Sequence, residues 1–462
     1  MGYVVGNGVV ITVDGMRRII KDGAVATEND RIVAVGKTDE VLKKYPDFEF
    51  VDAQDHIIMP GLVNGHVHLT QALIKGCADD TSLVDFLQHR VWRLMGNYEP
   101  HDAKVSAQLC ALEMIKSGTT TFAETLLTYK YGLDDITNVI IDSGMRGFLA
   151  KSVMDMATYA ARDNIMDPGM VEDGDECLKQ AIDWKAKYEN AGDGRIHIWL
   201  GPRPVGSSTK EMLEKVSACA RENDMGIAIH FCEVQEDVEL MRNKYHMAPG
   251  ELMEATGIFT DRTLLAHAVW LSDDDMMRIK RNGTTVVHCP ASNAKLASGC
   301  CLVPELLEKG VNVALGTDAG TCDNGYDMFD AMKLAGLLHK GRTLDPLVVP
   351  AESVIEMATI NGAKALKMDH EIGSLEVGKK ADLIMIDVMN PRVAPNINPV
   401  SAVVYSVDGS DVDNVMIDGK WIVKDNEILT MDEDAIIKES KAIIDKVLAQ
   451  AGVVNQSRWP ME

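Results

Sequence analysis

The sequence predicts an α/β protein, in which the middle of the chain forms a (β/α)8 barrel and both termini form a small β domain. Three observations predict this fold. Eight apolar runs alternate with helix-patterned stretches in the middle, Val- and Ile-rich strands occupy both ends, and 462 residues suffice for a large barrel with an appendage. Apolar residues make up 46% and charged residues 25% of the chain, the ordinary ratio for a globular protein.

The two ends, residues 1–56 and 366–462, are rich in short strands broken by Gly and Asp. Strands are predicted at 3–13, 23–27, 31–36, 381–388, 415–417 and 421–423. Asp418-Gly419 lies between the last two strands and is a favoured two-residue hairpin turn. A helix over residues 432–449 follows. We expect the two ends to join in one β domain.

The barrel is expected over residues 57–365. Its apolar runs lack polar alternation, which is typical of parallel strands covered by helices on both faces. The predicted strands are 56–67, 119–124, 147–153, 196–201, 226–230, 263–267, 284–288 and 311–318, and helices such as 103–116, 210–222 and 304–309 fill the gaps. A doubly wound sheet is the alternative, but no G-x-G-x-x-G motif opens a helix.

The charge of the chain argues against nucleic-acid and membrane-surface partners. Its 46 basic and 70 acidic side chains give a net charge of −24, which repels phosphate backbones and anionic lipid. The sequence predicts neither a secretory signal nor a membrane span, since no apolar run approaches ~18 residues. Nine cysteines without a C-x-x-C pair favour reduced thiols, and we expect a cytoplasmic protein.

Ionisable side chains stand where the predicted barrel strands end. They are His66 and His68 on strand 1, His230, His267 and His288 on strands 5 to 7, and Asp318 on strand 8. Such groups are costly to bury unless they share a partner, and the carboxyl ends of barrel strands are where active sites form. An isolated H-x-H pair is also compatible with two hydrogen-bonded core histidines. Four of these side chains supply three nitrogens and one oxygen, a set that suits a catalytic Zn²⁺: His66, His68, His230 and Asp318.

Six segments together resemble the amidohydrolase superfamily: PGLVNGHVHL, HFCE, AHAVW, HCPASNAKLASG, LGTDAG and EIGSLEVGKKADLIMID. The branch they resemble most contains methylthioadenosine/S-adenosylhomocysteine deaminases and s-triazine hydrolases. The resemblance implies a distorted barrel with a small β-sandwich, one Zn²⁺ or Fe²⁺, and a homo-oligomer (dimer or tetramer). Members with two metals usually carry a carboxylated lysine on strand 4. This strand ends Gly201-Pro202-Arg203 without a lysine, so one metal is expected.

The resemblance also implies a hydrolytic mechanism. A divalent metal lowers the pKa of its bound water towards ~7 and so supplies hydroxide at neutral pH. By resemblance, Asp318 and His267 take the proton and orient the water, which attacks a ring carbon bearing an amino group. Glu233, three residues after His230, is expected to protonate the ring nitrogen and the departing ammonia, which is worth ~10²–10⁴ in rate. The alternative for Glu233 is a solvated loop carboxylate. His288 lies outside the metal set and is expected to contact the substrate or a group next to the site, with a structural role as the alternative.

Two positions depart from the adenosine-type deaminases. Arg203 replaces a substrate-facing histidine, and Met95 corresponds to a glutamate that grips the ribose diol. The Arg203 guanidinium suits carboxylate or phosphate, so we hypothesise a substrate with an acidic or strongly accepting substituent; a structural ion pair is the alternative. Trp92 is a candidate to stack on a flat ring or to fill the core. By resemblance, Lys151 and Arg162 are candidate substrate contacts, since they fall near positions where relatives carry substrate-binding arginines.

Three functions remain open at this point. The first is a metal-dependent aminohydrolase of an amino-substituted nitrogen heterocycle, such as an aminopurine, a nucleoside, a pterin or a triazine. The second keeps the metal but displaces chloride or an alkylamine from a triazine-like ring. The third is a catalytically silent scaffold, which the retained candidate ligands disfavour.

Overall fold

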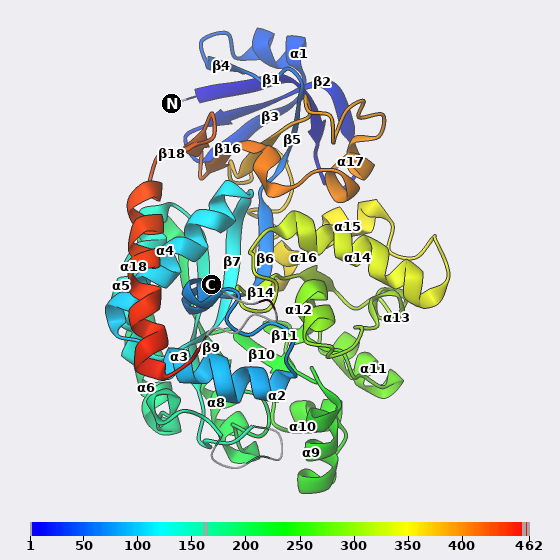
Figure 1. Cartoon of the computed structure of the whole chain (residues 1–462). Helices are drawn as coiled ribbons and strands as arrows, with labels where there is room; N and C mark the ends of the chain where they lie inside the picture. Colours follow the sequence, from blue (N-terminus) through cyan, green and yellow to red (C-terminus); the bar gives the residue numbers. More distant parts are fainter. Residues whose placement is uncertain (1, 160–161, 163–164, 455–458, 460–462) are drawn as a thin grey trace.

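The computed structural model describes residues 2–159, 162, 165–454 and 459 (Figure 1). In these ranges the strands form two nine-stranded sheets, one from the middle of the chain and one from both ends. Figure 1 shows the terminal sheet, in blue and orange, at one end of the parallel sheet and its helices. No helix in the described ranges combines the length and the apolar character that a bilayer crossing requires.

The parallel sheet curls into the predicted barrel. Its strands are β6 (Leu62–His68), β7 (Thr119–Leu127), β8 (Arg146–Val153), β9 (Ile196–Pro202), β10 (Ile227–Phe231), β11 (Thr263–His267), β12 (Thr285–His288), β13 (Val313–Leu315) and β14 (Asp318–Ala319). Each strand from β6 to β12 pairs with the next, and β14 returns to pair with β6, where Asp318 lies opposite Val67. The ring therefore closes through the last two strands, and the doubly wound alternative is wrong.

Most of the helices surround the barrel strands, as the apolar character of both strand faces requires, whereas the helix Thr38–Lys44 packs on the terminal sheet. The helices are α1 (Thr38–Lys44), α2 (Leu83–Phe86), α3 (Trp92–Gly96), α4 (Pro100–Lys116), α5 (Leu133–Ser143), α6 (Gly174–Tyr188), α7 (Ala191–Gly194), α8 (Lys210–Glu222), α9 (Gln235–Tyr245), α10 (Pro249–Ala255), α11 (Asp273–Arg281), α12 (Pro290–Lys295), α13 (Val303–Glu308), α14 (Met328–Thr343), α15 (Ala351–Met357), α16 (Ile360–Ala365), α17 (Pro399–Tyr405) and α18 (Glu433–Ala451). The last helix lies along α4 (Figure 1), where Lys116 Nζ is 2.6 Å from Glu433 Oε2.

The terminal sheet joins strands that are more than 300 residues apart. Its strands are β1 (Gly2–Ile11), β2 (Ile19–Glu28), β3 (Arg31–Lys37), β4 (Glu49–Asp52), β5 (His56–Pro60), β15 (Leu383–Asp387), β16 (Val412–Ile417), β17 (Lys420–Lys424) and β18 (Glu427–Ile428). Antiparallel pairing of β5 with β15 connects the two halves. The predicted turn is confirmed, because Asp418 and Gly419 have φ values of 48° and 71° between paired Ile417 and Lys420.

Two of the predicted barrel strands are each interrupted. The run 56–67 is two strands, since β5 belongs to the terminal sheet and β6 begins after Gly61. Both strands are buried, so hydrophobicity alone shows no boundary between them. The run 311–318 breaks at Gly316, whose N–H donates to His288 O at 3.0 Å, and the chain then crosses to β6.

Candidate functional site

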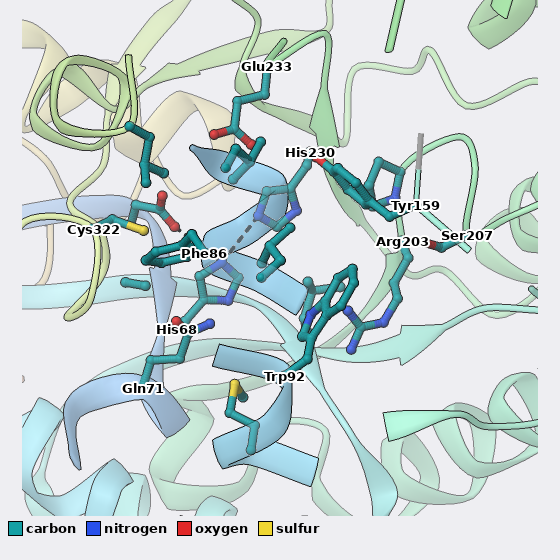
Figure 2. A pocket seen from close by; sticks show the side chains of 18 of the residues that line it. His68, Gln71, Phe86, Trp92, Tyr159, Arg203, Ser207, His230, Glu233 and Cys322 are labelled. Carbon is teal, nitrogen blue, oxygen red and sulfur yellow. Dashed lines mark hydrogen bonds and ion pairs between the residues drawn. The ribbon is translucent and has the colours of Figure 1, made fainter. Parts of the chain in front are cut away.

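Four of the side chains at the strand ends converge at one end of the barrel. His66 Nε2 and His68 Nε2 each lie 3.2 Å from Asp318 Oδ1, and His68 Nε2 lies 3.2 Å from His230 Nε2. His267 joins them, because His66, His230, His267 and Asp318 each offer one ligand atom within 4.8 Å of the others. These five residues form the histidine–aspartate cluster. Figure 2 shows the rings of His68 and His230 directed toward each other across the cavity.

Neighbouring side chains fix the orientation of these rings. His66 Nδ1 is 2.7 Å from Thr125 Oγ1 on β7, and His267 Nδ1 is 2.9 Å from Asn293 Oδ1 on α12. The amide oxygen only accepts hydrogen bonds, so His267 Nδ1 carries the proton and its Nε2 has a free lone pair. Ser292 Oγ donates to Asp318 Oδ2 at 2.6 Å. The carboxylate is thereby held with its other oxygen facing the histidines.

The cluster has the properties of a metal site. Nε2 of His66 and of His267 are buried and have no hydrogen-bond partner within the described structure, although both face the Asp318 carboxylate. Buried polar atoms are ordinarily paired, and lone pairs that converge on one point repel unless a cation lies between them. Imidazole nitrogen and carboxylate oxygen are ligands that Zn²⁺ accepts. The residues present therefore fit a divalent metal ion.

Burial and mutual contacts shift the pKa values within the cluster. Burial lowers the pKa of His66 to about 4. Burial also opposes the charge on His68, but Asp318 and Glu124 outweigh it and raise the pKa of His68 to about 9. Burial alone would raise the pKa of Asp318, whereas His66 and His68 hold it well below its usual range. The aspartate is thus ionised and available as a ligand.

Two cluster residues have strained backbones. His267 has a φ of 69° and Asp318 a φ of 65°, in the left-handed region that non-glycine residues rarely adopt. Such conformations cost of the order of 1–3 kcal/mol and concentrate at functional sites. Gly316 permits the close approach of the last barrel segment, since a Cβ there would lie 2.8 Å from His66 Cβ.

Glu233 stands beside the cluster at the carboxyl end of β10. Its Oε2 is 3.7 Å from His267 Nε2, and its Oε1 accepts a hydrogen bond from Ser298 Oγ at 3.2 Å. The side chain of Asp237 holds this turn, because Oδ2 accepts the backbone N–H of Glu233 at 3.0 Å. Burial raises the pKa of the Glu233 carboxyl above its ordinary value. Glu233 is 4% exposed, so the alternative of a solvated loop carboxylate is wrong.

The cluster forms the floor of a cavity (Figure 2). Its aromatic walls are Phe86, Trp92 and Tyr159, of which the last two make an edge-to-face contact with ring centroids 5.8 Å apart. Aliphatic and thioether side chains cover most of the rest: Leu83, Leu87, Met95, Leu126, Met170 and Leu296. Arg203 and Ser207 line one side, and Thr70 and Gln71 another. A mostly apolar cavity with a few polar groups is typical of a small-molecule site.

The amidohydrolase family model matches residues 57–422, which is most of the chain. The chain belongs to the amidohydrolase family. It is 36% identical to a 5'-deoxyadenosine deaminase of Methanosarcina acetivorans over 97% of this chain and 99% of that protein. It is 35% identical to a 5-methylthioadenosine/S-adenosylhomocysteine deaminase of Acetivibrio thermocellus, over 97% of this chain and all of that one. A zinc-bound adenosine deaminase from Xanthomonas campestris superposes with a TM-score of 0.89 at 28% identity, over 97% and 98% of the two chains.

These comparisons confirm the resemblance predicted from the sequence motifs. The relatives are hydrolases of C–N bonds, and this amidohydrolase is an enzyme of the same kind. The histidine–aspartate cluster has the composition of a metal site, and the superposed structure from Xanthomonas holds zinc.

Three of the predicted substrate contacts line the cavity, and three do not. Arg203, Met95 and Trp92 belong to its walls. Lys151 is fully buried outside the described lining and pairs with Glu172 at 3.0 Å. The side chain of Arg162 is more than half exposed, and its Nη1 lies 3.8 Å from Asp85 Oδ1. Neither Lys151 nor Arg162 belongs to the lining of the cavity of this amidohydrolase, and each has a carboxylate partner of its own.

His288 also lies outside the cavity lining. Its Nε2 faces His339 Nε2 on α14 at 3.2 Å, and both rings are fully buried. His339 comes 51 residues later in the sequence, so no local pattern indicated this contact. This buried contact favours the structural role of His288 over direct contact with substrate.

Four contributors to the site were not predicted. Glu124 ends the second predicted strand, and its Oε1 lies 3.7 Å from His68 Nδ1. An ionisable side chain at the end of an apolar strand, the pattern that identified the histidines, was therefore also present at Glu124. Thr125, Ser292 and Asn293 orient cluster residues through hydrogen bonds. The last two lie within the HCPASNAKLASG segment, and hydroxyl and amide side chains are too common in turns for the sequence to single them out.

Proposed function

We propose that this amidohydrolase is a metal-dependent hydrolytic deaminase of an amino-substituted nitrogen heterocycle, with aminopurine nucleosides as the first candidates. One observation carries the proposal: the histidine–aspartate cluster and Glu233 meet at the floor of one apolar cavity. The two relatives named as deaminases of deoxyadenosine-type compounds, each matched over 97% of this chain, support the choice of ring.

One divalent ion per chain, zinc, is proposed to bind His66, His68, His230 and Asp318. When bound, the ion supplies Lewis acidity and lowers the pKa of a water in its open position. The free Nε2 of His66, the facing Nε2 atoms of His68 and His230, and the ionised Asp318 support this ligand set. His267, which also faces the cluster, is held by Asn293 and contributes as a positioned base rather than a required ligand.

The roles of the residues follow from their positions. His267 Nε2 lies 3.9 Å from Asp318 Oδ2 and 3.7 Å from Glu233 Oε2, between the two carboxylates. In this place it orients the attacking water and holds a proton. Ser298 Oγ donates a hydrogen bond to Glu233 Oε1, which leaves Oε2 facing the cavity. The Oε2 atom is thus placed to donate a proton to the ring nitrogen and then to the amino group. The balanced reaction replaces the ring C–NH₂ with C=O, consumes one water and releases ammonia.

The walls of the cavity hold the ring. Phe86, Trp92 and Tyr159 offer aromatic faces and edges to a flat heterocycle, a contact worth about 0.5–1.5 kcal/mol for each pair beyond area burial. Burial of the ring also excludes bulk water, which strengthens every charge interaction at the floor.

The setting of the enzyme is proposed on separate grounds. All nine cysteines are unpaired, which supports a cytoplasmic location where thiols stay reduced. A homo-oligomer, a dimer or tetramer, is supported by exposed leucines on and after α14. These are Leu334, Leu337, Leu344 and Leu347, with exposures from 37% to 89%.

Ammonia release from a panel of aminopurine nucleosides, pterins, pyrimidines and triazines tests the function. We expect release from at least one ring class, and Glu233→Gln to lower kcat by about 10²–10⁴ while the bound metal is retained. The matched control is Glu236→Gln, which alters an exposed neighbour. Release of chloride or alkylamine without ammonia would assign the second function instead. No turnover with any ring would contradict the proposal.

A further inference from the structure

Arg203 is a buried cation for which the described part of the chain provides no counter-ion. Its residue is 4% exposed, its Nε has no hydrogen-bond partner, and no carboxylate of the described residues lies within 4.0 Å of its guanidinium. Removing an ion from water costs several kcal/mol, and a buried charge is ordinarily retained only with a partner. Within the described ranges the guanidinium therefore lacks a carboxylate partner, which a bound anionic ligand would supply.

The nearest acid does not fill this role. Glu172 Oε2 pairs with Lys151 Nζ at 3.0 Å, and its Oε1 accepts the Tyr129 N–H at 3.0 Å. Arg146 shows how the same chain pairs a structural guanidinium. That side chain is 1% exposed and contacts the carboxylates of both Asp382 and Asp418. Among the residues that the structure describes, Arg203 has no such pair of acids, so none of them forms the structural ion pair that was the alternative.

The position of Arg203 connects it with the reaction. Leu200 on β9 pairs with Ile227 on β10, and Arg203 and His230 each follow three residues later, so they leave adjacent strands at the same level. Figure 2 shows the guanidinium directed toward Trp92, which with Arg203 lines the cavity above the cluster. The carboxylates of the described lining, Glu233 and Asp318, belong to the floor. Arg203 is therefore the cation of the cavity wall.

The Arg203 guanidinium in the cavity wall favours an anionic partner over a neutral one. A hydrogen bond to a neutral acceptor leaves the buried guanidinium charge uncompensated, whereas a carboxylate accepts hydrogen bonds and also neutralises that charge. The planar guanidinium binds a carboxylate through two parallel hydrogen bonds. Met95 nearby has no oxygen or nitrogen to bind a diol.

We propose that Arg203 is a specificity-determining residue that binds a carboxylate carried by a substituent of the aminated ring, so that the preferred substrates are anionic. This inference rests on the proposed deaminase function, because it names the substrate class of the same cavity. It concerns binding of the substituent and adds no step to the reaction at the floor.

Matched ligand pairs test the inference without turnover. Adenosine 5'-carboxylate is compared with its 5'-carboxamide, and pterin 6-carboxylate with its 6-carboxamide, by calorimetry on Glu233→Gln. We expect at least one carboxylate to bind at least about 30-fold more tightly than its carboxamide, the smaller of the effects seen when a buried charge pair is truncated. Adding Arg203→Gln to this variant should abolish the preference. Adding Arg203→Lys instead should retain part of it, because lysine keeps the positive charge but lacks the paired N–H groups of the guanidinium.

The control is Arg221→Gln, which removes the same charge from the exposed end of α8 and should leave the preference unchanged. The inference is overturned if no carboxylate binds more tightly than its carboxamide, or if Arg203→Gln weakens both members of a pair equally. Ammonia release is measured separately on the parent enzyme. If the parent enzyme releases no ammonia but the preference for carboxylates depends on Arg203, only the proposed deaminase function is refuted. If the parent enzyme releases ammonia but shows no Arg203-dependent preference, only this inference is refuted.

Discussion

His68 Nε2 lies 3.2 Å from His230 Nε2, although 162 residues separate the two histidines. His68 ends β6 and His230 lies in β10, and the barrel brings both close to Asp318. Facing nitrogens at this distance are stabilised by a shared proton or by a shared cation. The nearby free Nε2 atoms of His66 and His267 make a cation the better explanation, since one proton pairs with only two of these atoms.

Removal of metal should destabilise the folded chain. A ligand that binds only the native state adds RT ln(1 + [L]/Kd), which is about 4.1 kcal/mol at 1,000 times Kd. We expect a chelator to lower the thermal unfolding midpoint by several degrees and added Zn²⁺ to restore it, as measured by calorimetry. His66→Ala should respond weakly to both treatments. Equal responses of the two proteins would place the stabilising ion elsewhere.

Gly316→Ala should disturb the cluster. The new Cβ would lie 2.8 Å from His66 Cβ and 2.9 Å from its backbone nitrogen, between two buried segments that have little room to move. Displacing a ligand through its surroundings typically lowers metal affinity about 10- to 100-fold, which a competition titration measures. Gly341→Ala is the control, because no atom lies within 4 Å of its Cβ and alanine favours the helix. Unchanged affinity in Gly316→Ala would show that the barrel accommodates the methyl group.

Replacement of two buried arginines should affect the free energy of unfolding differently. Arg146→Met leaves Asp382 and Asp418 without their shared partner and should lower the free energy of unfolding by about 3–5 kcal/mol. Arg203→Met removes an unpaired charge and should leave the free energy unchanged or increase it. Denaturant unfolding of both variants measures the contrast. A large loss in Arg203→Met would mean that the guanidinium has a structural partner.

The His56–Asp413 pair should stabilise the protein in a pH-dependent way. Burial alone would lower the pKa of His56, but Asp413 Oδ2, 2.8 Å from Nε2, raises it above its ordinary value of 6.5. The stabilisation is then complete below 6.5 and disappears as the pH rises through the higher pKa of the folded state. Asp413→Asn should therefore lower the unfolding midpoint more at pH 6 than at pH 9. An equal effect at both pH values would contradict the pairing.

The barrel, and the meeting of five candidate residues at one end of it, could be predicted from the sequence for two physical reasons. Eight uninterrupted apolar runs are specific to buried parallel strands, and His66, His68, His230, His267 and Asp318 all follow such runs. A strand end is a defined place in a barrel, so residues far apart in sequence were assigned to one site.

The features that the sequence did not reveal depend on tertiary contacts. The boundary at Gly61 lies inside one apolar run because β5 and β6 are buried in different sheets. The His288–His339 pair joins a strand to a distant helix. Lys151 and Arg162 resemble Arg203 in charge, and only their ion pairs with Glu172 and Asp85 distinguish them from a residue directed into the cavity.

The metal content of the purified enzyme tests the central claim most directly. Elemental analysis of the parent protein and of His230→Ala is combined with an ammonia-release assay on the same samples, and His101→Ala serves as an exposed histidine control. We predict one divalent ion per chain and ammonia release in the parent and in His101→Ala, and the loss of both in His230→Ala. A full equivalent of metal in His230→Ala, or undiminished ammonia release from metal-free protein, would contradict the account.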